Sequence, residues 1–163
     1  MNYRIGDVTY PQTKNPCIIP HIVNNVGLWG SGVVVAISKR WKEPEKRYRE
    51  GRLKLGETQF IGVESDKAPY PIIIANMCAQ KGVGRGDSYK IGKMNYIQPP
   101  IRYDCLLECM LKVGKAAWEN KLEIHAPKFG SDRAGGDWTK IEGMIKEIWE
   151  NNGISVDIYE YEE

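Results

Sequence analysis

The sequence is poor in histidine and cysteine, the usual ligands of zinc: its 163 residues include only two histidines and four cysteines. His21 and His125 do not form a pair with metal-ligand spacing. Cys105 and Cys109 are four residues apart on one predicted helix face, but a zinc site would need two further ligands. We therefore expect no metal and no other cofactor.

Long apolar runs are also absent, since a run such as Ile72–Ala75 is far too short to cross a bilayer. The cysteines lie in or beside apolar segments, and the mixed opening segment Met1–Asp7 contains no secretory signal. These features exclude a membrane protein and predict reduced thiols in a cytoplasmic protein.

Neither sign of charge dominates: 23 Lys and Arg residues face 21 Asp and Glu residues, a formal net charge of +2. Such a balance gives no general attraction to nucleic acid or membranes, so neither is an expected partner. Basic residues cluster between Lys39 and Arg52, but Glu43, Glu45 and Glu50 interleave them, which is typical of a solvated face. The length suits one domain spanning residues 1–163.

Strands and helices are predicted to alternate along the chain. The apolar and β-branched patterns predict strands at 4–5, 17–23, 58–63, 72–77, 122–126 and 154–158, and helices at 33–42, 103–119 and 139–151. Asp137 precedes the last helix and can cap it. Residues 79–100 are rich in Gly, Lys and polar residues, and we interpret them as a long functional loop. The order predicts an α/β fold with helices on both faces of a largely parallel sheet.

Two glycine-rich segments, Gly27–Gly32 and Pro127–Gly136, each follow a predicted strand and precede a predicted helix. Exposed amide N–H groups and the positive end of a helix suit phosphate oxygens. Two such loops at one sheet edge could hold a diphosphate between them, although either could be an ordinary turn. The glycine-rich runs Gly27–Gly32 and Gly82–Gly86 both lack the spacing of a dinucleotide motif and of a P-loop.

Three segments in order resemble the macrodomain family. They are Gly6-Asp7-Val8-Thr9, then Ile22-Val23-Asn24-Asn25 with Gly30-Ser31-Gly32, and Pro127-Lys128-Phe129-Gly130 leading to Gly135-Gly136-Asp137-Trp138. The likeness spans nearly the whole chain and is nearest to the branch of ADP-ribose 1″-phosphate phosphatases and terminal ADP-ribose protein glycohydrolase. It implies a three-layer α/β/α fold around a mixed, mostly parallel sheet, with an ADP-ribose cleft that needs no metal.

The resemblance also implies roles for individual residues. Asp7 would accept a hydrogen bond from the adenine amino group, and the Val8 amide would meet a ring nitrogen. Asn24 and Asn25 would lie beside the distal ribose. The diphosphate would lie between the two loops, with Gly30, Ser31 and Gly32 on one side and Phe129, Gly130, Ser131, Arg133 and Ala134 on the other.

The departures from the family bear on mechanism. Val34 stands where the mono-ADP-ribosyl hydrolase branch has an aspartate, and Ala134 stands where the glycohydrolase branch has one. Gln80 occupies the position of that branch's lysine nucleophile, with Lys81 one residue later. His21 and Asp132 remain as acid–base candidates, although a histidine in an apolar strand is more often a core residue.

We therefore expect an ADP-ribose-binding macrodomain that removes phosphate from ADP-ribose 1″-phosphate, with Asp132, His21, Gln80 and Lys81 as catalytic candidates. One alternative is a reader of ADP-ribose, free or attached to protein, without turnover. Another is a hydrolase that frees ADP-ribose from protein or nucleic acid with Lys81 as nucleophile. An RNA-binding α/β domain is a further alternative, disfavoured by the charge balance.

Overall fold

A six-stranded sheet forms the middle layer of the protein in the computed structural model, which describes residues 1–63 and 71–161. The strand order is β1-β8-β7-β2-β4-β3. The bounds are β1 Asn2–Ile5, β2 Cys17–Asn24, β3 Thr58–Val63, β4 Ile72–Gln80, β7 Glu123–Pro127 and β8 Val156–Glu160. All neighbouring strands are parallel except β3 and β4, so the predicted mixed, mostly parallel sheet is confirmed.

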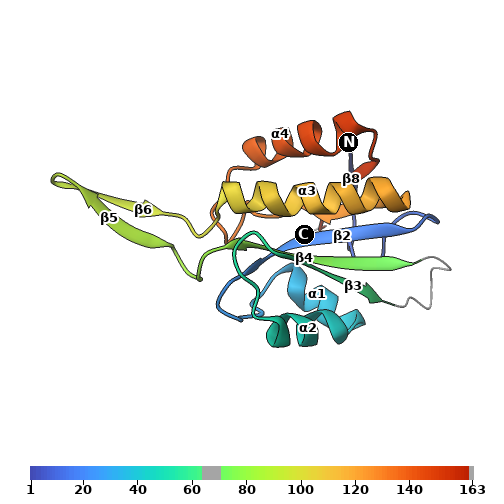
Figure 1. The fold of residues 1–163 in the computed structure, drawn as a ribbon, viewed down its shortest axis with the longest axis horizontal. Coiled ribbons are helices and arrows are strands. Elements are labelled where there is room, and N and C mark those ends of the chain that lie inside the picture. Colours follow the sequence, from blue (N-terminus) through green and yellow to red (C-terminus); the bar gives the residue numbers. More distant parts are fainter. Residues whose placement is uncertain (64–70, 162–163) are drawn as a thin grey trace.

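Helices cover both faces of this sheet, which gives three layers (Figure 1). One face carries α3, Tyr103–Asn120, and α4, Trp138–Ile148, followed by the short 3₁₀ helix η1, Glu150–Asn152. The other face carries α1, Val33–Arg40, and α2, Glu43–Gly51. The Asp137 carboxylate accepts a hydrogen bond from the Thr139 amide at 2.9 Å, which confirms the predicted cap of α4.

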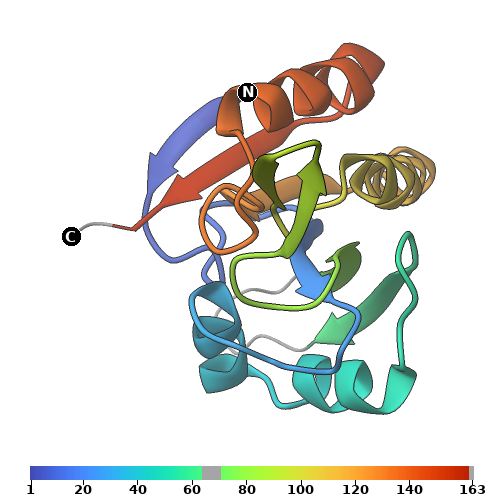
Figure 2. The ribbon, with the colours of Figure 1, turned by 90° about the vertical axis from the view of Figure 1, so that its left-hand side faces the viewer.

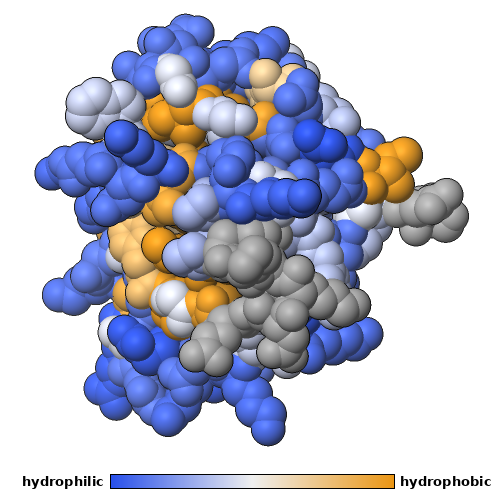
Figure 3. Space-filling model, turned by 90° about the vertical axis from the view of Figure 1, so that its right-hand side faces the viewer, coloured by the Kyte–Doolittle hydropathy of each residue, from blue (hydrophilic) through white to orange (hydrophobic). Residues whose placement is uncertain are grey.

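Alternation along the central strands divides the core between the two faces. Ile18, Ala75 and Met77 belong to the cluster under α3 and α4, whereas Ile19 and Ile74 belong to the cluster that includes Ile37 of α1. Successive strand residues point to opposite faces, so a run that is apolar at every position must be covered on both sides. The end of the molecule viewed in Figure 3 is covered mostly by hydrophilic residues, with apolar side chains visible between them.

Two predictions about local structure were wrong. The helix expected at 33–42 ends at Arg40, and Pro44 lies in the first turn of a second helix instead of only stopping the first. The segment 79–100, expected to be a loop, contains the two-stranded antiparallel hairpin of β5, Asp87–Ile91, and β6, Met94–Gln98. Gly92 and Lys93 form its turn, a signal that the abundance of glycine and polar residues concealed.

Candidate functional site

The segments that follow the neighbouring strands β2 and β7 lead to opposite faces of the sheet. The chain after β2 leads to α1 on one face, and the chain after β7 leads to α4 on the other (Figure 1). The pairing of the two strands ends at Ile18 and Ile124, before either strand reaches its carboxyl end. A crevice at such a switch point is the usual ligand site of an open α/β sheet.

A cleft of about 950 Å³ occupies this crevice. Both glycine-rich loops reach the end of the sheet that faces the viewer in Figure 2. The cleft walls come from the end of β2, the two loops, the segment after β4 and the end of β8. They comprise His21, Ile22, Val23, Asn24, Leu28, Trp29, Gly30, Ser31, Gly32, Val33, Val34, Gln80, Val83, Gly84, Pro127, Lys128, Phe129, Gly130, Ser131, Asp132, Arg133, Ala134, Tyr159, Glu160 and Tyr161.

The first glycine loop leads directly into the start of α1. Gly32 occupies the N-cap position with φ +82°, and no side chain caps the helix. The amides of Val33 and Val34 donate no hydrogen bond within residues 1–63 and 71–161. Uncapped N–H groups at a helix start carry partial positive charge, so this wall of the cleft suits an anion.

The conformation of the second glycine loop is fixed by core side chains that pack against Gly130. Gly130 has φ +81°, and a Cβ there would lie 2.9–3.0 Å from the Cδ1 atoms of Ile22, Ile101 and Ile141. Its carbonyl accepts a hydrogen bond from Gly136 N at 2.7 Å, which closes the loop. Among the described residues, the Ser131 and Asp132 amides donate no hydrogen bond. Rigid backbone with free N–H groups therefore faces the first loop across the cleft.

The other predicted residues of this loop divide between core and cleft. Phe129 and Ala134 are buried, and the Phe129 ring meets the Trp149 ring edge-on. Arg133 is exposed on the cleft wall. The Asp132 carboxylate makes no hydrogen bond or ion pair within the described chain, so it is available to a bound ligand.

Asp7 lies in a second hollow of about 360 Å³ that shares Gly32 and Tyr161 with the cleft. Its Oδ1 accepts hydrogen bonds from Thr9 N at 2.9 Å and Thr9 Oγ1 at 2.7 Å, which fixes the turn after β1. Val8 is buried in the core beside this turn. Because the hollows share two residues, one elongated molecule could reach from Asp7 to the second glycine loop.

The two asparagines at the carboxyl end of β2, Asn24 and Asn25, form hydrogen bonds to backbone groups. Asn24 Oδ1 accepts from Val26 N at 3.0 Å and from the Tyr48 hydroxyl at 2.7 Å, and its Nδ2 donates to Leu28 O. Asn25 Oδ1 accepts from Gly82 N at 2.8 Å, and Asn25 does not line the cleft. Both side chains therefore shape the loop next to the expected distal ribose, a role that sequence patterns did not reveal.

His21 is completely buried behind Trp29, whose ring meets it edge-on at 5.4 Å. Asn76 Nδ2 donates to Pro44 O and to Gln59 Oε1, so Asn76 Oδ1 faces His21 Nε2 at 2.5 Å. Nε2 is therefore the protonated nitrogen, and Nδ1 keeps a lone pair with no partner among the described residues. Burial lowers the pKa of His21 to about 4, so at neutral pH the ring carries no charge and its Nδ1 can accept a hydrogen bond.

This burial makes folding stability depend on pH. An unfolded histidine has a pKa of about 6.5, so below that value the unfolded chain binds a proton that the folded chain excludes. We expect the free energy of unfolding to fall by about 3 kcal/mol as the pH drops from 7 to 4 because of His21 alone. Urea unfolding of the wild type and of His21→Gln at several pH values measures this term. Equal pH slopes for the two proteins would contradict it, since all other titrating groups are common to both.

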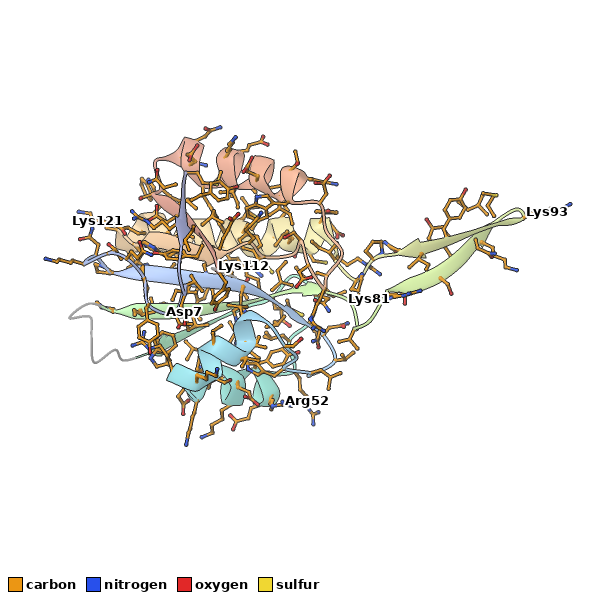
Figure 4. The ribbon with its side chains drawn as sticks, turned by 180° about the vertical axis from the view of Figure 1, so that it is seen from behind. Asp7, Arg52, Lys81, Lys93, Lys112 and Lys121 are labelled. Atoms are coloured by element: carbon orange, nitrogen blue, oxygen red, sulfur yellow. The ribbon has the colours of Figure 1, made fainter. Side chains whose placement is uncertain are left out.

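The side chains of Gln80 and Lys81, at the end of β4, have different surroundings. Gln80 lines the cleft and donates from Nε2 to Gly82 O at 3.1 Å. Lys81 does not line the cleft, and its Nζ lies 3.2 Å from Asp87 Oδ2 at the base of the β5–β6 hairpin (Figure 4). The two adjacent candidates therefore have different surroundings.

Several residues of the cleft were not predicted from the sequence. Tyr161 joins the two hollows, and its hydroxyl lies 3.4 Å from Asp7 Oδ1. Val83 and Gly84 line the cleft from the segment between β4 and β5. Tyr161 follows the last strand 154 residues after Asp7, so only the parallel pairing of β1 with β8 reveals that they are neighbours.

No group of three or more metal-ligating side chains occurs within residues 1–63 and 71–161. In the same part of the chain, none of the helices has both the length and the apolar character needed to span a membrane.

No protein-family model matches the sequence. Two curated relatives, the chromodomain-helicase-DNA-binding protein 1-like proteins of Danio rerio and Mus musculus, are 29% and 28% identical over 99% and 98% of this chain. The chain spans 16% and 17% of the length of these relatives.

Solved structures resemble the chain over almost its entire length. A protein of unknown function from Bacteroides thetaiotaomicron is 37% identical with a TM-score of 0.83, covering 97% of this chain and 96% of that one. A macrodomain protein from Streptomyces coelicolor is 32% identical with a TM-score of 0.79, covering 99% of each chain. Thermosipho africanus DarTG in complex with ADP-ribose has the same fold, with a TM-score of 0.69 at 13% identity over 99% of this chain and 42% of that one.

Proposed function

The chain belongs to the macrodomain family, and on that premise we propose that its cleft binds ADP-ribose. The observation that carries the proposal is that two loops with unpaired amides line the same cleft at the switch point between β2 and β7. One loop leads to α1 on one face of the sheet, and the other leads to α4 on the opposite face. Their N–H groups would hold the diphosphate. Support also comes from a relative of the same fold, which was solved in complex with ADP-ribose.

The shape of the two hollows supports one orientation of the ligand. Adenine would lie beside Asp7, the diphosphate would pass Gly32 and the second glycine loop, and the distal ribose would lie near Gln80 and Asn24. A carboxylate beside adenine favours it over guanine, because it can accept from the exocyclic amino group that guanine lacks at that position. Calorimetric titration with ADP-ribose tests this proposal, and an absence of binding at millimolar ligand would refute it.

The adenine assignment predicts that Asp7→Ala weakens ADP-ribose binding by about 1.5–3 kcal/mol, or about 10–150-fold, through loss of a charge-assisted hydrogen bond. Asp7→Asn keeps an acceptor for the Thr9 turn but loses the charge, so its affinity should lie between those of the wild type and Asp7→Ala. Thr9→Val removes one hydroxyl from the same turn and should retain the affinity. Wild-type affinity in Asp7→Ala would place adenine elsewhere.

Beyond binding, we propose that the protein hydrolyses the terminal phosphate of ADP-ribose 1″-phosphate. Asp132 lies on the cleft wall with a carboxylate that has no partner in the described chain. It would take a proton from a water whose oxygen attacks phosphorus, while the bond from phosphorus to the ribose oxygen breaks. Asp132 would then return this proton to the leaving ribose oxygen, so that the products are ADP-ribose and inorganic phosphate. The neighbouring amides would stabilise charge on the phosphoryl oxygens.

Two other functions use the same cleft. A reader would bind ADP-ribose, free or attached to a protein, and release no phosphate. A hydrolase that frees ADP-ribose from an acceptor would need Lys81 as nucleophile, but its Nζ is paired with Asp87 and lies outside the cleft wall. A phosphate-release assay on ADP-ribose 1″-phosphate separates the phosphatase from the reader, and Lys81→Ala assayed on an ADP-ribosylated acceptor tests the third function.

A further inference from the structure

The β5–β6 hairpin projects from the end of the molecule that carries the cleft (Figures 1 and 4). All ten strand residues of this arm, Asp87–Ile91 and Met94–Gln98, are exposed. A two-stranded hairpin has no core of its own and is marginally stable in water without further packing. A hairpin that extends into solvent therefore offers its side chains to a partner.

One face of the arm is apolar and aromatic. The strand register pairs Tyr89 with Tyr96 and Ile91 with Met94, and alternation directs these four side chains to the same face. The two tyrosine rings stack at 5.3 Å between centroids with 20° between their planes. Tyr89 is 46% exposed and Tyr96 is 39% exposed, so the pair is accessible for stacking by a planar group.

Positive charge is concentrated in the same segment. Residues 81–102 contain five basic residues and one acidic residue, a net charge of +4, whereas the whole chain carries only +2. Asp87 Oδ2 lies 3.2 Å from both Lys81 Nζ and Arg102 Nη2, so the only carboxylate of this segment is already neutralised. Arg85, Lys90 and Lys93 have no ion pair within the described residues, and Lys93 lies at the tip of the arm (Figure 4).

We propose that this arm binds single-stranded nucleic acid. Stacked aromatic rings supply platforms for unpaired bases, and nearby cations without partners meet the phosphates, which is the combination used for single strands. A folded acidic protein would satisfy the charges but would not require a paired aromatic platform. The near-neutral total charge, which disfavours nucleic acid as a partner, conceals this local excess because the rest of the chain carries a net negative charge.

The arm is separate from the ADP-ribose cleft but begins at its edge, since Val83 and Gly84 line the cleft and directly precede β5. A strand bound along the arm would therefore pass the cleft mouth while leaving the ADP-ribose contacts free. The proposal does not depend on ADP-ribose binding, and unmodified oligonucleotide is the appropriate probe.

Fluorescence anisotropy with a labelled twelve-nucleotide oligothymidylate tests the arm in the full chain. We expect the logarithm of the association constant to fall linearly with the logarithm of the salt concentration, with a slope of about −2, as for three contacting cations. Tyr89→Ala should weaken binding about tenfold, and the double variant Lys90→Gln with Lys93→Gln should reduce the slope by about 1.4. The double variant Lys115→Gln with Lys146→Gln, on the exposed surfaces of α3 and α4, should bind like the wild type.

Four results would overturn the proposal: no binding of the oligonucleotide in low salt, equal binding by the tyrosine and lysine variants, competition by polyglutamate as effective as that by oligothymidylate, or a duplex bound as tightly as the single strand. Sedimentation is a further check, because a dimer that Tyr89→Ala dissociates would assign the arm to self-association instead.

Saturating ADP-ribose should leave oligonucleotide affinity unchanged, and ADP-ribose titrations of Tyr89→Ala should match the wild type. If the oligonucleotide did not bind, the proposed ADP-ribose function would therefore be unaffected.

Discussion

Replacement of Asp132 by asparagine should lower kcat for phosphate release from ADP-ribose 1″-phosphate by about 10²–10⁴-fold, the usual contribution of a general base. Asparagine preserves the size of the side chain but cannot take a proton from water. The carboxylate has no hydrogen bond or ion pair within residues 1–63 and 71–161, so its loss should leave the fold of the second glycine loop intact. Phosphate release under single-turnover conditions measures the chemical step directly.

Calorimetry on the same variant distinguishes catalysis from binding. The dissociation constant for ADP-ribose should be unchanged or slightly lower, because a negative charge near the distal end of an anionic ligand is removed. Asp104→Asn supplies the matched control, since Asp104 is an exposed carboxylate in the first turn of α3 and is not part of the cleft. Unchanged turnover in Asp132→Asn would remove Asp132 from the mechanism, whereas undetectable phosphate release by the wild type, with ADP-ribose binding retained, would favour the reader.

Replacement of Gly130 by valine should destabilise the protein by about 2–5 kcal/mol and abolish ADP-ribose binding. A β-branched residue at φ +81° incurs backbone strain of about 1–2 kcal/mol. Its Cβ would also lie within 3.0 Å of three isoleucine methyl groups, and such overpacking costs about 1–3 kcal/mol. Relief of these clashes must move the loop that would hold the diphosphate. Thermal unfolding should show a decrease in Tm of about 10 °C.

Gly143→Ala is the control for glycine replacement. Gly143 lies on the exposed face of α4, and a Cβ there would meet nothing within 4 Å. Alanine should stabilise this helix by about 1 kcal/mol and leave ADP-ribose affinity unchanged. If Gly130→Val folded with wild-type stability, the packing beneath the second glycine loop would not be what fixes its conformation.

Among the residues predicted for the site, the backbone positions of the two glycine loops do line the cleft. Gly30, Gly32 and Gly130 were identified because glycines between a strand and a helix indicate a tight loop, and this signal is local. Side-chain roles were harder to predict. Asn24 and Asn25 satisfy backbone groups next to the cleft, and the partners that occupy them come from α2 and from the segment after β4. Adjacent residues Gln80 and Lys81 differ in access to the cleft because the backbone leaves β4 between them.

The sequence alone determined the six strands of the main sheet, helices α1, α3 and α4 and the two glycine loops, because each of these depends on a local pattern, and it missed α2 and the β5–β6 hairpin. The alternation of strands and helices along the chain then indicated a mostly parallel sheet. The tertiary structure decided which loops share a cleft, that the C-terminal Tyr161 joins it to the Asp7 hollow, and that Asn76 sets the protonated nitrogen of His21. It also decided that residues 87–98 form an exposed arm. Contacts between residues far apart in the chain arise from sheet pairing and layer packing, and no local pattern encodes them.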